Sequence, residues 1–457
     1  MGLQKTVVIN LVGLSQRILG AHTPWLNSQV QKNGFQLIKP QVPAVTCTQQ
    51  ATYITGETPQ AHGIVGNGWY FKDECEVKFW RQSNKLVNAR KLWEAAKEQD
   101  PEFTCANLFW WYNMYSSVDY AVTPRPNYLA DGRKIPDIYS HPASLRNHLQ
   151  QKLGPFPLFH FWGPTTSIKS SKWIADAARL IDQQYHPTLS LIYLPHLDYC
   201  LQKFGHDLAA ISGDLQEIDT LCGQLAEYYQ NKGTQIIVLS EYGITDVHRP
   251  IHLNRIFRRN GWLQVREERG RELLDAGASE VFAVADHQIA HVYLRDPSNI
   301  DLVRLELQQL EGVDQVWDRE IQRQNGLDHP RSGDLVVLAE ENSWFTYYYW
   351  LEDRKAPDFA RTVDIHRKPG YDPVEMFTDP RIKFLKPLVA WKLLKKKMGF
   401  RTLMDVIPLD ANLIRGSHGV VPRAHEDWPM VIANGLDSGK NITSPEIYSI
   451  IWNHLNH

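Results

Sequence analysis

Thr46 stands where a hydroxyl group could act as a nucleophile. It directly precedes a short predicted helix, residues 48–55, which ends at Gly56. A threonine hydroxyl is a poor nucleophile at neutral pH, but it improves when a metal ion lowers its pKa and a helix N-terminus favours negative charge. Backbone N–H groups of the first turn would also hold phosphoryl oxygens. Position alone favours the simpler interpretation, a helix cap without a catalytic role.

Carboxylates and histidines supply candidate metal ligands elsewhere in the chain. Asp198 and Glu241 each follow a predicted strand. Two histidines at i,i+4 spacing can bind zinc. Such pairs occur in histidine-rich stretches of the chain, although they also arise by chance among 18 histidines. The alternative metal candidates from these stretches are His196, His248, His252 and His287.

Short apolar strands alternate with helices and must position these groups. The pattern predicts strands at residues 6–12, 104–109, 189–194 and 236–240, and helices at 90–98, 171–186 and 209–231. This alternation is typical of an α/β fold with a mostly parallel sheet and helices on both faces. Sites in such folds gather at the carboxyl ends of strands. We therefore expect Thr46, Asp198 and Glu241 to converge there.

Two regions interrupt the alternation. We predict core segments at 1–106, 187–279 and 403–457, an aromatic-rich cap at 107–186 and a small inserted α+β subdomain at 280–402. Within the insertion we expect strands at 289–294, 313–317 and 334–339 and a helix at 299–311. The aromatic runs at 109–115, 159–162 and 343–350 either fill the core or stack on a flat substrate. The Lys395–Lys397 run reads as a solvated helix face.

Composition limits the class of protein. The chain of 457 residues is 43% hydrophobic and 22% charged, which is typical of a globular protein. Its net charge of -2 gives no reason to expect a nucleic acid polymer or an anionic membrane as partner. The five cysteines form no CxxC pair, which fits a reducing, cytoplasmic compartment. No secretory signal and no membrane span are expected.

Several motifs carry a resemblance to a known family. The segment VPAVTCTQQATYITGETPQAHGIVGNGWY, residues 42–70, resembles the nucleophile segment of type I phosphodiesterases/nucleotide pyrophosphatases, a branch of the alkaline phosphatase superfamily. LVGL (11–14), YLPHLDYCLQKFG (193–205), VLSEYGIT (238–245) and RGSHGVVP (415–422) resemble the further landmarks of that family, in the same order. The resemblance implies an alkaline-phosphatase-like core.

The resemblance also assigns roles to individual residues. It implies that Thr46 is the nucleophile, forming a covalent phosphothreonine, and that Asn67 contacts a phosphoryl oxygen. Asp198 and His418 match metal ligands of the family. Glu241 occupies the position of a further metal ligand, an aspartate. The implied activity is metal-dependent hydrolysis of a phosphoester or phosphodiester in a small phosphorylated substrate.

Three departures from the family pattern concern the metal ions. Val12 replaces an aspartate, while Gln202 and Tyr242 replace histidines and are weak or substituted ligands. We therefore expect fewer than two tightly bound divalent ions, zinc or else manganese. Two alternatives stay open: an inactive member that binds a phosphorylated or aromatic small molecule or a partner protein, and a hydrolase whose metal site is rebuilt from the additional histidines. The sequence does not indicate an oligomeric state.

Overall fold

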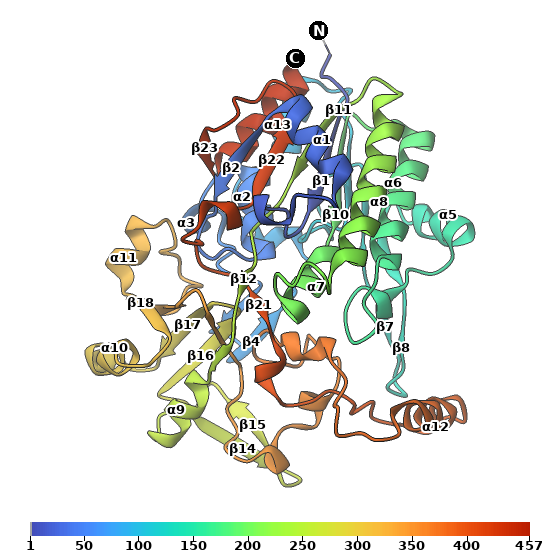
Figure 1. The fold of residues 1–457 in the computed structure, drawn as a ribbon. Coiled ribbons are helices and arrows are strands. Elements are labelled where there is room, and N and C mark those ends of the chain that lie inside the picture. The colour runs from blue at the N-terminus through green and yellow to red at the C-terminus, as the bar shows by residue number, and fades with distance from the viewer. Residues whose placement is uncertain (1) are drawn as a thin grey trace.

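The computed structural model describes residues 2–457, and a nine-stranded sheet forms its centre (Figure 1). In spatial order its strands are β23 (Asn441–Thr443), β2 (Phe35–Lys39), β22 (Met430–Ala433), β11 (Gln235–Leu239), β1 (Thr6–Leu11), β10 (Leu189–Leu194), β5 (Cys105–Leu108), β6 (Tyr120–Pro124) and β9 (Ile138–His141). The central strands β11, β1, β10, β5 and β6 run parallel, and β22 and β9 are antiparallel to their neighbours. All residues of β1 and β10 are buried, as their continuous apolar runs predict.

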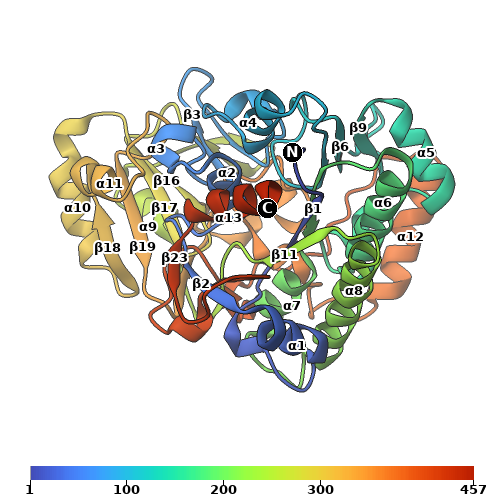
Figure 2. The ribbon, with the colours of Figure 1, turned by 90° about the horizontal axis from the view of Figure 1, so that it is seen from above.

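Helices cover both faces of this sheet (Figure 2). On one face lie α1 (Pro24–Asn33), α5 (Ser144–Leu153), α6 (Lys169–Tyr185) and α8 (Ser212–Gln230); on the other lie α2 (Thr46–Thr55) and α13 (Glu446–Asn456). In α6 the apolar spacing that predicts a helix buries Trp173, Ala177 and Ile181 against the sheet. The predicted α/β architecture with a mostly parallel sheet is confirmed.

A smaller layer with its own core lies beside the main sheet. It is an antiparallel sheet in the order β16 (Val281–Asp286), β17 (Ile289–Leu294), β19 (Leu335–Ala339) and β18 (Val313–Trp317), flanked by α9 (Leu253–Arg259), α10 (Ile300–Gln308) and α11 (Arg319–Gln324). The predicted strand at 289–294 coincides with β17, and the predicted helix at 299–311 contains α10. A hairpin of β14 (Gln264–Glu268) and β15 (Arg271–Asp275) extends this layer.

Shorter elements lie around and between the two layers. They include α3 (Pro59–His62), α4 (Leu92–Gln99), α7 (His196–Phe204) and the hairpins β3 (Gly68–Phe71)–β4 (Glu76–Phe79) and β7 (Asn127–Tyr128)–β8 (Lys134–Ile135). Strands β12 (Thr245–Asp246) and β21 (Gly416–Ser417) pair with each other, as do β13 (Arg249–Ile251) and β20 (Ser343–Phe345). The helix α12 (Leu385–Lys397) projects from the body. Within residues 2–457 no helix has the length and apolarity needed to cross a bilayer.

The aromatic runs divide between core and cavity. Trp110, Tyr112 and the run 347–350 are fully buried and belong to the two cores and the cluster between them. Residues 107–186 also add β6 and β9 to the main sheet. Trp111, Tyr115 and the side chains near residue 160 line a cavity, and packing explains most of the other aromatic residues in these runs.

Candidate active site at the sheet's carboxyl edge

The first turn of α2 places Thr46 at the floor of a cavity. Val45 is extended and precedes the helix, so Thr46 is the first helical residue, two positions earlier than predicted. Its side chain is buried, and its Oγ1 lies 3.0 Å from the phenolic oxygen of Tyr242. Because Tyr242 donates its proton to Asp198 Oδ1, over a long 3.4 Å, its oxygen accepts the Thr46 proton. The hydroxyl of Thr46 is thereby held in one orientation at the cavity.

His418 lies beside this chain of hydrogen bonds in a defined tautomer. Its Nδ1 donates to the carbonyl oxygen of Ala44 at 2.7 Å, so Nε2 keeps its lone pair. Nε2 has no hydrogen-bond partner within residues 2–457 and lies 3.8 Å from Asp198 Oδ1. Burial lowers the pKa of His418 well below its usual value and raises the pKa of Asp198 to about 7.

Four rings form a continuous stack through the site. Tyr242 and His418 stack at 3.5 Å between centroids, His418 and His287 lie 3.8 Å apart, and His287 stacks on Tyr371 at 3.6 Å. The hydroxyl of Tyr371 donates to Gln202 Oε1 at 3.1 Å. The two residues that replace family histidines, Tyr242 and Gln202, are therefore each engaged with a hydroxyl group of the protein.

Glu241 lies below the cavity floor and is not part of its wall. Its Oε1 accepts a hydrogen bond from Asn10 Nδ2 at 2.6 Å and another from the Gln50 side-chain amide. Glu241 is fully buried, and burial raises its pKa to about 8. At neutral pH the group is therefore mostly a neutral acid within a network of amides, next to the apolar side chain of Val12.

Asn67 joins α2 to the smaller layer. Its Oδ1 accepts from the backbone N–H of Cys47 at 3.0 Å, and its Nδ2 donates to Asp286 Oδ1 at 3.1 Å. Asp286 also accepts the backbone N–H of Asn67 at 2.8 Å. The side chain of Asn67 thus orients the first turn of α2, and both of its polar atoms are engaged by the protein.

Of the alternative histidines, only His287 joins the site. His248 and His252 flank the strand β13, so the i,i+4 helical pairing that we considered for them is wrong. His252 instead lies 2.7 Å from the Thr346 hydroxyl. His196 points away from the cavity, and its Nε2 lies 3.0 Å from Asp214 Oδ1 on α8.

The residues present do not fit a pair of metal ions. Where the family pattern implies the second ion, Val12 offers no ligand atom, Oε1 of Glu241 accepts from two amides, and the Tyr242 phenol lies 3.0 Å from the Thr46 hydroxyl. At the position of the first, Asp198 Oδ1 and His418 Nε2 still face each other. Their lone pairs suit one divalent ion at most.

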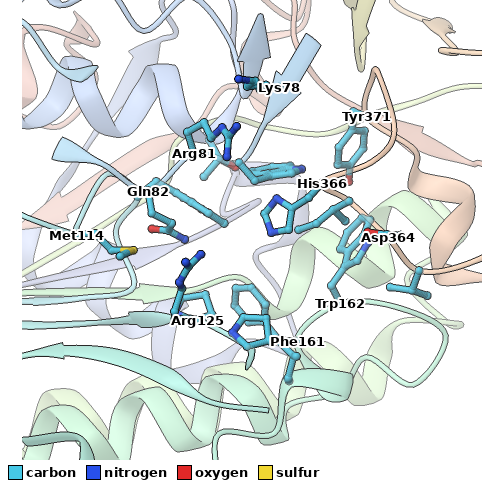
Figure 3. Close-up of a pocket in the computed structure, with 18 of the residues that line it drawn as sticks. Lys78, Arg81, Gln82, Met114, Arg125, Phe161, Trp162, Asp364, His366 and Tyr371 are labelled. Atoms are coloured by element: carbon cyan, nitrogen blue, oxygen red, sulfur yellow. The ribbon is translucent and has the colours of Figure 1, made fainter. Parts of the chain in front are cut away.

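Thr46 is one of the residues that line a cavity of about 800 Å³, and Figure 3 shows this cavity in close-up. Its walls are largely aromatic, from Trp80, Trp111, Trp162, Phe161, Tyr199 and Tyr371. Its outer part carries Arg81, Arg125 and Lys134, which form no ion pair within residues 2–457. Arg125 directly follows β6. The rule that sites gather at the carboxyl ends of strands would have identified Arg125 if β6 had been predicted from the sequence. Arg81 and Tyr371 come from irregular segments that give no such signal.

A buried ion triad fixes one wall of the cavity. Lys368 Nζ lies 2.8 Å from Asp372 and 2.7 Å from Glu375, and all three side chains are buried. Glu375 also accepts from Trp162 Nε1 at 2.5 Å and from the backbone N–H of Asp364 at 3.1 Å. The triad therefore holds Trp162 and the segment around Asp364 in place.

Lys368→Met is expected to lower the free energy of unfolding by about 3–5 kcal/mol, because it leaves two buried carboxylates without a cation. Urea denaturation followed by circular dichroism measures this. Lys97→Met is the control, since Lys97 pairs with Asp119 at the surface and its loss is expected to cost less than about 1 kcal/mol. Equal losses in the two variants would contradict the prediction.

Fold and site together define a class, the alkaline-phosphatase-like α/β proteins with a threonine at a helix N-terminus. The chain belongs to the type I phosphodiesterase/nucleotide pyrophosphatase family, whose model matches residues 6–372. It is 25% identical over 259 residues to an uncharacterized pyrophosphatase/phosphodiesterase of Schizosaccharomyces pombe, and 22% identical over 275 residues to ectonucleotide pyrophosphatase/phosphodiesterase 1 of Saccharomyces cerevisiae. These matches cover 55% and 54% of this chain, but only 47% and 34% of the relatives. This is a family of hydrolases.

Solved structures share the fold. Phosphonoacetate hydrolase from Sinorhizobium meliloti, in complex with phosphonoformate, is similar with a TM-score of 0.63 and 15% identity. Murine ectonucleotide pyrophosphatase/phosphodiesterase 5, in an inactive form bound to AMP, gives 0.58 and 14%. Each similarity covers 99% of this chain and 95% of the other chain.

Proposed function

We propose that this protein hydrolyses a phosphoester or phosphodiester bond in a small molecule bound in the cavity, with Thr46 as the nucleophile. The observation that carries the proposal is the placement of the Thr46 hydroxyl. It lies at a helix N-terminus, at the floor of a cavity, and its proton is committed to Tyr242. Family membership supports the reaction class.

The proposed reaction proceeds through a defined sequence of bond changes. Thr46 Oγ1 attacks phosphorus and forms a P–O bond as the bond to the leaving alcohol breaks; the Thr46 proton passes to Tyr242 while Tyr242 passes its own to Asp198, and the leaving alkoxide takes a proton from water. Water then cleaves the phosphothreonine, which restores the Thr46 hydroxyl and releases the phosphate product. The helix N-terminus favours the negative charge that gathers at the phosphoryl oxygens. Asn67 supports this step by orienting the first turn through Cys47. A divalent ion held by Asp198 and His418 would neutralise part of the charge on the phosphoryl group.

The cavity supports a substrate with a flat or apolar portion and an anionic group. The aromatic walls provide stacking surfaces for the flat or apolar portion of the substrate. The unpaired arginines at the outer part of the cavity attract its anionic group. A screen of nucleotides, phosphomonoesters, phosphodiesters and phosphonates, with and without zinc or manganese, tests the proposal. Turnover of at least one class is expected, and no turnover under any condition would contradict it.

Binding without turnover is the second candidate function. The observation that favours it is that Val12, Tyr242 and a buried, amide-bonded Glu241 occupy the positions implied for the second ion, which leaves weak ligands for the ion that would activate the threonine. Saturable binding of a phosphorylated compound, measured by calorimetry in a protein inert throughout the screen, would establish this function.

Arg125→Gln is expected to raise KM for an anionic substrate about tenfold and to change kcat little, because the guanidinium lies at the outer part of the cavity, away from Thr46. Steady-state kinetics on the best substrate of the screen measures both constants. Arg133→Gln is the matched control, since Arg133 is exposed, pairs with Asp131 and does not line the cavity. A fall in kcat alone would contradict the assigned role.

A further inference from the structure

The helix α12 exposes apolar side chains on the face turned away from the protein. Leu385 and Val389 pack against the core of the smaller layer, and Lys392, on the same face, donates to the carbonyl oxygen of Leu403. Trp391 and Leu394 lie on the opposite face by helical spacing. They are about half exposed, at 51% and 48%. Apolar residues on two opposite faces explain why the sequence gives no simple amphipathic pattern.

Further exposed apolar residues adjoin this face. Met398, which lies one turn beyond Leu394, and Phe400 are both more than half exposed, as is Phe384 just before the helix. Figure 1 shows the helix standing clear of both sheets. We define the α12 face as Trp391, Leu394, Met398 and Phe400. Isolated exposed apolar residues are ordinary, but a group of this kind on one projecting element marks an interaction surface.

The charge of the same segment identifies the chemistry of the partner. Residues 380–404 contain eight lysines and arginines and no acidic residue, although the whole chain has a net charge of -2. Lys386 and Lys397 lie on one side of the α12 face, and Lys395 lies on the other, with its Nζ 5.1 Å from the centre of the Trp391 ring. An outward apolar stripe between rows of lysines suits a surface that is apolar inside and anionic outside.

We propose that the α12 face docks on an anionic lipid bilayer. Trp391, Leu394 and Met398 would enter the boundary between headgroups and acyl chains, while the flanking lysines contact anionic headgroups. The net charge of the chain conceals this site because acidic residues elsewhere outweigh a basic segment that is concentrated in one place.

Docking in this way brings the cavity to the bilayer. The Arg401 guanidinium donates to the carbonyl oxygen of Ala130, in the turn of the β7–β8 hairpin. Tyr128 and Lys134 of that hairpin line the cavity, and Tyr128 is half exposed. The segment that follows α12 is therefore tied to the rim of the cavity, and a bound protein presents this rim beside the lipid surface.

Co-sedimentation of the full chain with vesicles tests the proposal. Vesicles that contain phosphatidylglycerol are expected to bind the protein, those of phosphatidylcholine alone to bind it weakly, and salt to reduce binding. Lys395→Gln/Lys396→Gln/Lys397→Gln is expected to weaken partitioning about 100-fold, from roughly fivefold for each of the three lysines. Trp391→Ser/Leu394→Ser is expected to weaken it at least about tenfold.

The matched control is Lys32→Gln/Lys152→Gln/Lys440→Gln, which removes the same charge from three exposed lysines outside the segment. It is expected to bind vesicles like the wild type. Equal loss of binding in the control, or no preference for phosphatidylglycerol, would overturn the proposal. Binding to an acidic polypeptide such as polyglutamate but not to vesicles would also overturn it and would assign the face to an acidic protein. Unchanged melting temperatures verify that the variants are folded.

Discussion

Thr46→Ala is expected to abolish phosphoester hydrolysis, lowering kcat by at least about 10³-fold while the fold is retained. The substitution removes the only hydroxyl that is both on the first turn of α2 and at the cavity floor. Because Thr46 caps no backbone group with its side chain, the expected loss of stability is about 1 kcal/mol or less. Steady-state kinetics on the best substrate, with circular dichroism as a check on folding, measures both effects.

Thr48→Ala is the matched control for this experiment. Thr48 lies two residues further along α2, and its hydroxyl donates to the carbonyl oxygen of Ile64 rather than facing the cavity. Its loss is expected to reduce stability by about 1–2 kcal/mol and to leave kcat nearly unchanged. Full activity in Thr46→Ala would place the chemistry elsewhere, and His287 would be the first residue to test.

Protein purified without chelator is expected to contain at most about one tightly bound divalent ion per chain, because within the site Asp198 Oδ1 and His418 Nε2 face each other, while the other possible ligand group among residues 2–457, His196, Asp214 and Glu217, is partly exposed. Inductively coupled plasma mass spectrometry gives the number. Two tightly bound ions in the wild type would show that the residues rearrange around them and would refute our interpretation of the site.

A restored variant is the matching gain-of-function experiment. Val12→Asp, Gln202→His, Glu241→Asp and Tyr242→His together return the carboxylates and imidazoles that the family pattern has at these positions. The variant is expected to bind a second ion, with affinity for zinc at least about 100-fold higher than in the wild type at that position. Tyr242→His alone is the control and is expected to fall short, since Glu241 remains bonded to Asn10 and Gln50.

The sequence predicted the fold well where burial alone determines the element. β1 and β10 are continuous apolar runs buried on both faces, and they need no partner-specific information to be recognised. β2 was missed because its residues alternate between buried and partly exposed positions and its partners lie about 400 residues away. α12 was read only as a solvated face, because its apolar residues point in two opposite directions.

The sequence predicted which residues form the site, but not their protonation states or their hydrogen bonds. Motif order placed Asp198, Tyr242 and His418 near Thr46, where the structure has them. It could not show that burial raises the pKa of Glu241, or that two amides donate to its Oε1, since those amides come from distant segments. The contribution of Tyr371 to the ring stack likewise depends on packing between the two layers.

The position of β22 has a consequence for the order in which the chain folds. This strand lies between β11 and β2, and β2 has no other sheet neighbours than β22 and β23. At synthesis rates of about 5–20 residues per second, β2 leaves the ribosome roughly 20–80 s before its partners. The strand β11 is made about 190 residues before β22, so its edge is open for roughly 10–40 s and is prone to mispairing. The C-terminal segment also supplies His418 and the helix α13, which packs on α2. The site can therefore be completed only after the segment from His418 to α13 has been synthesised.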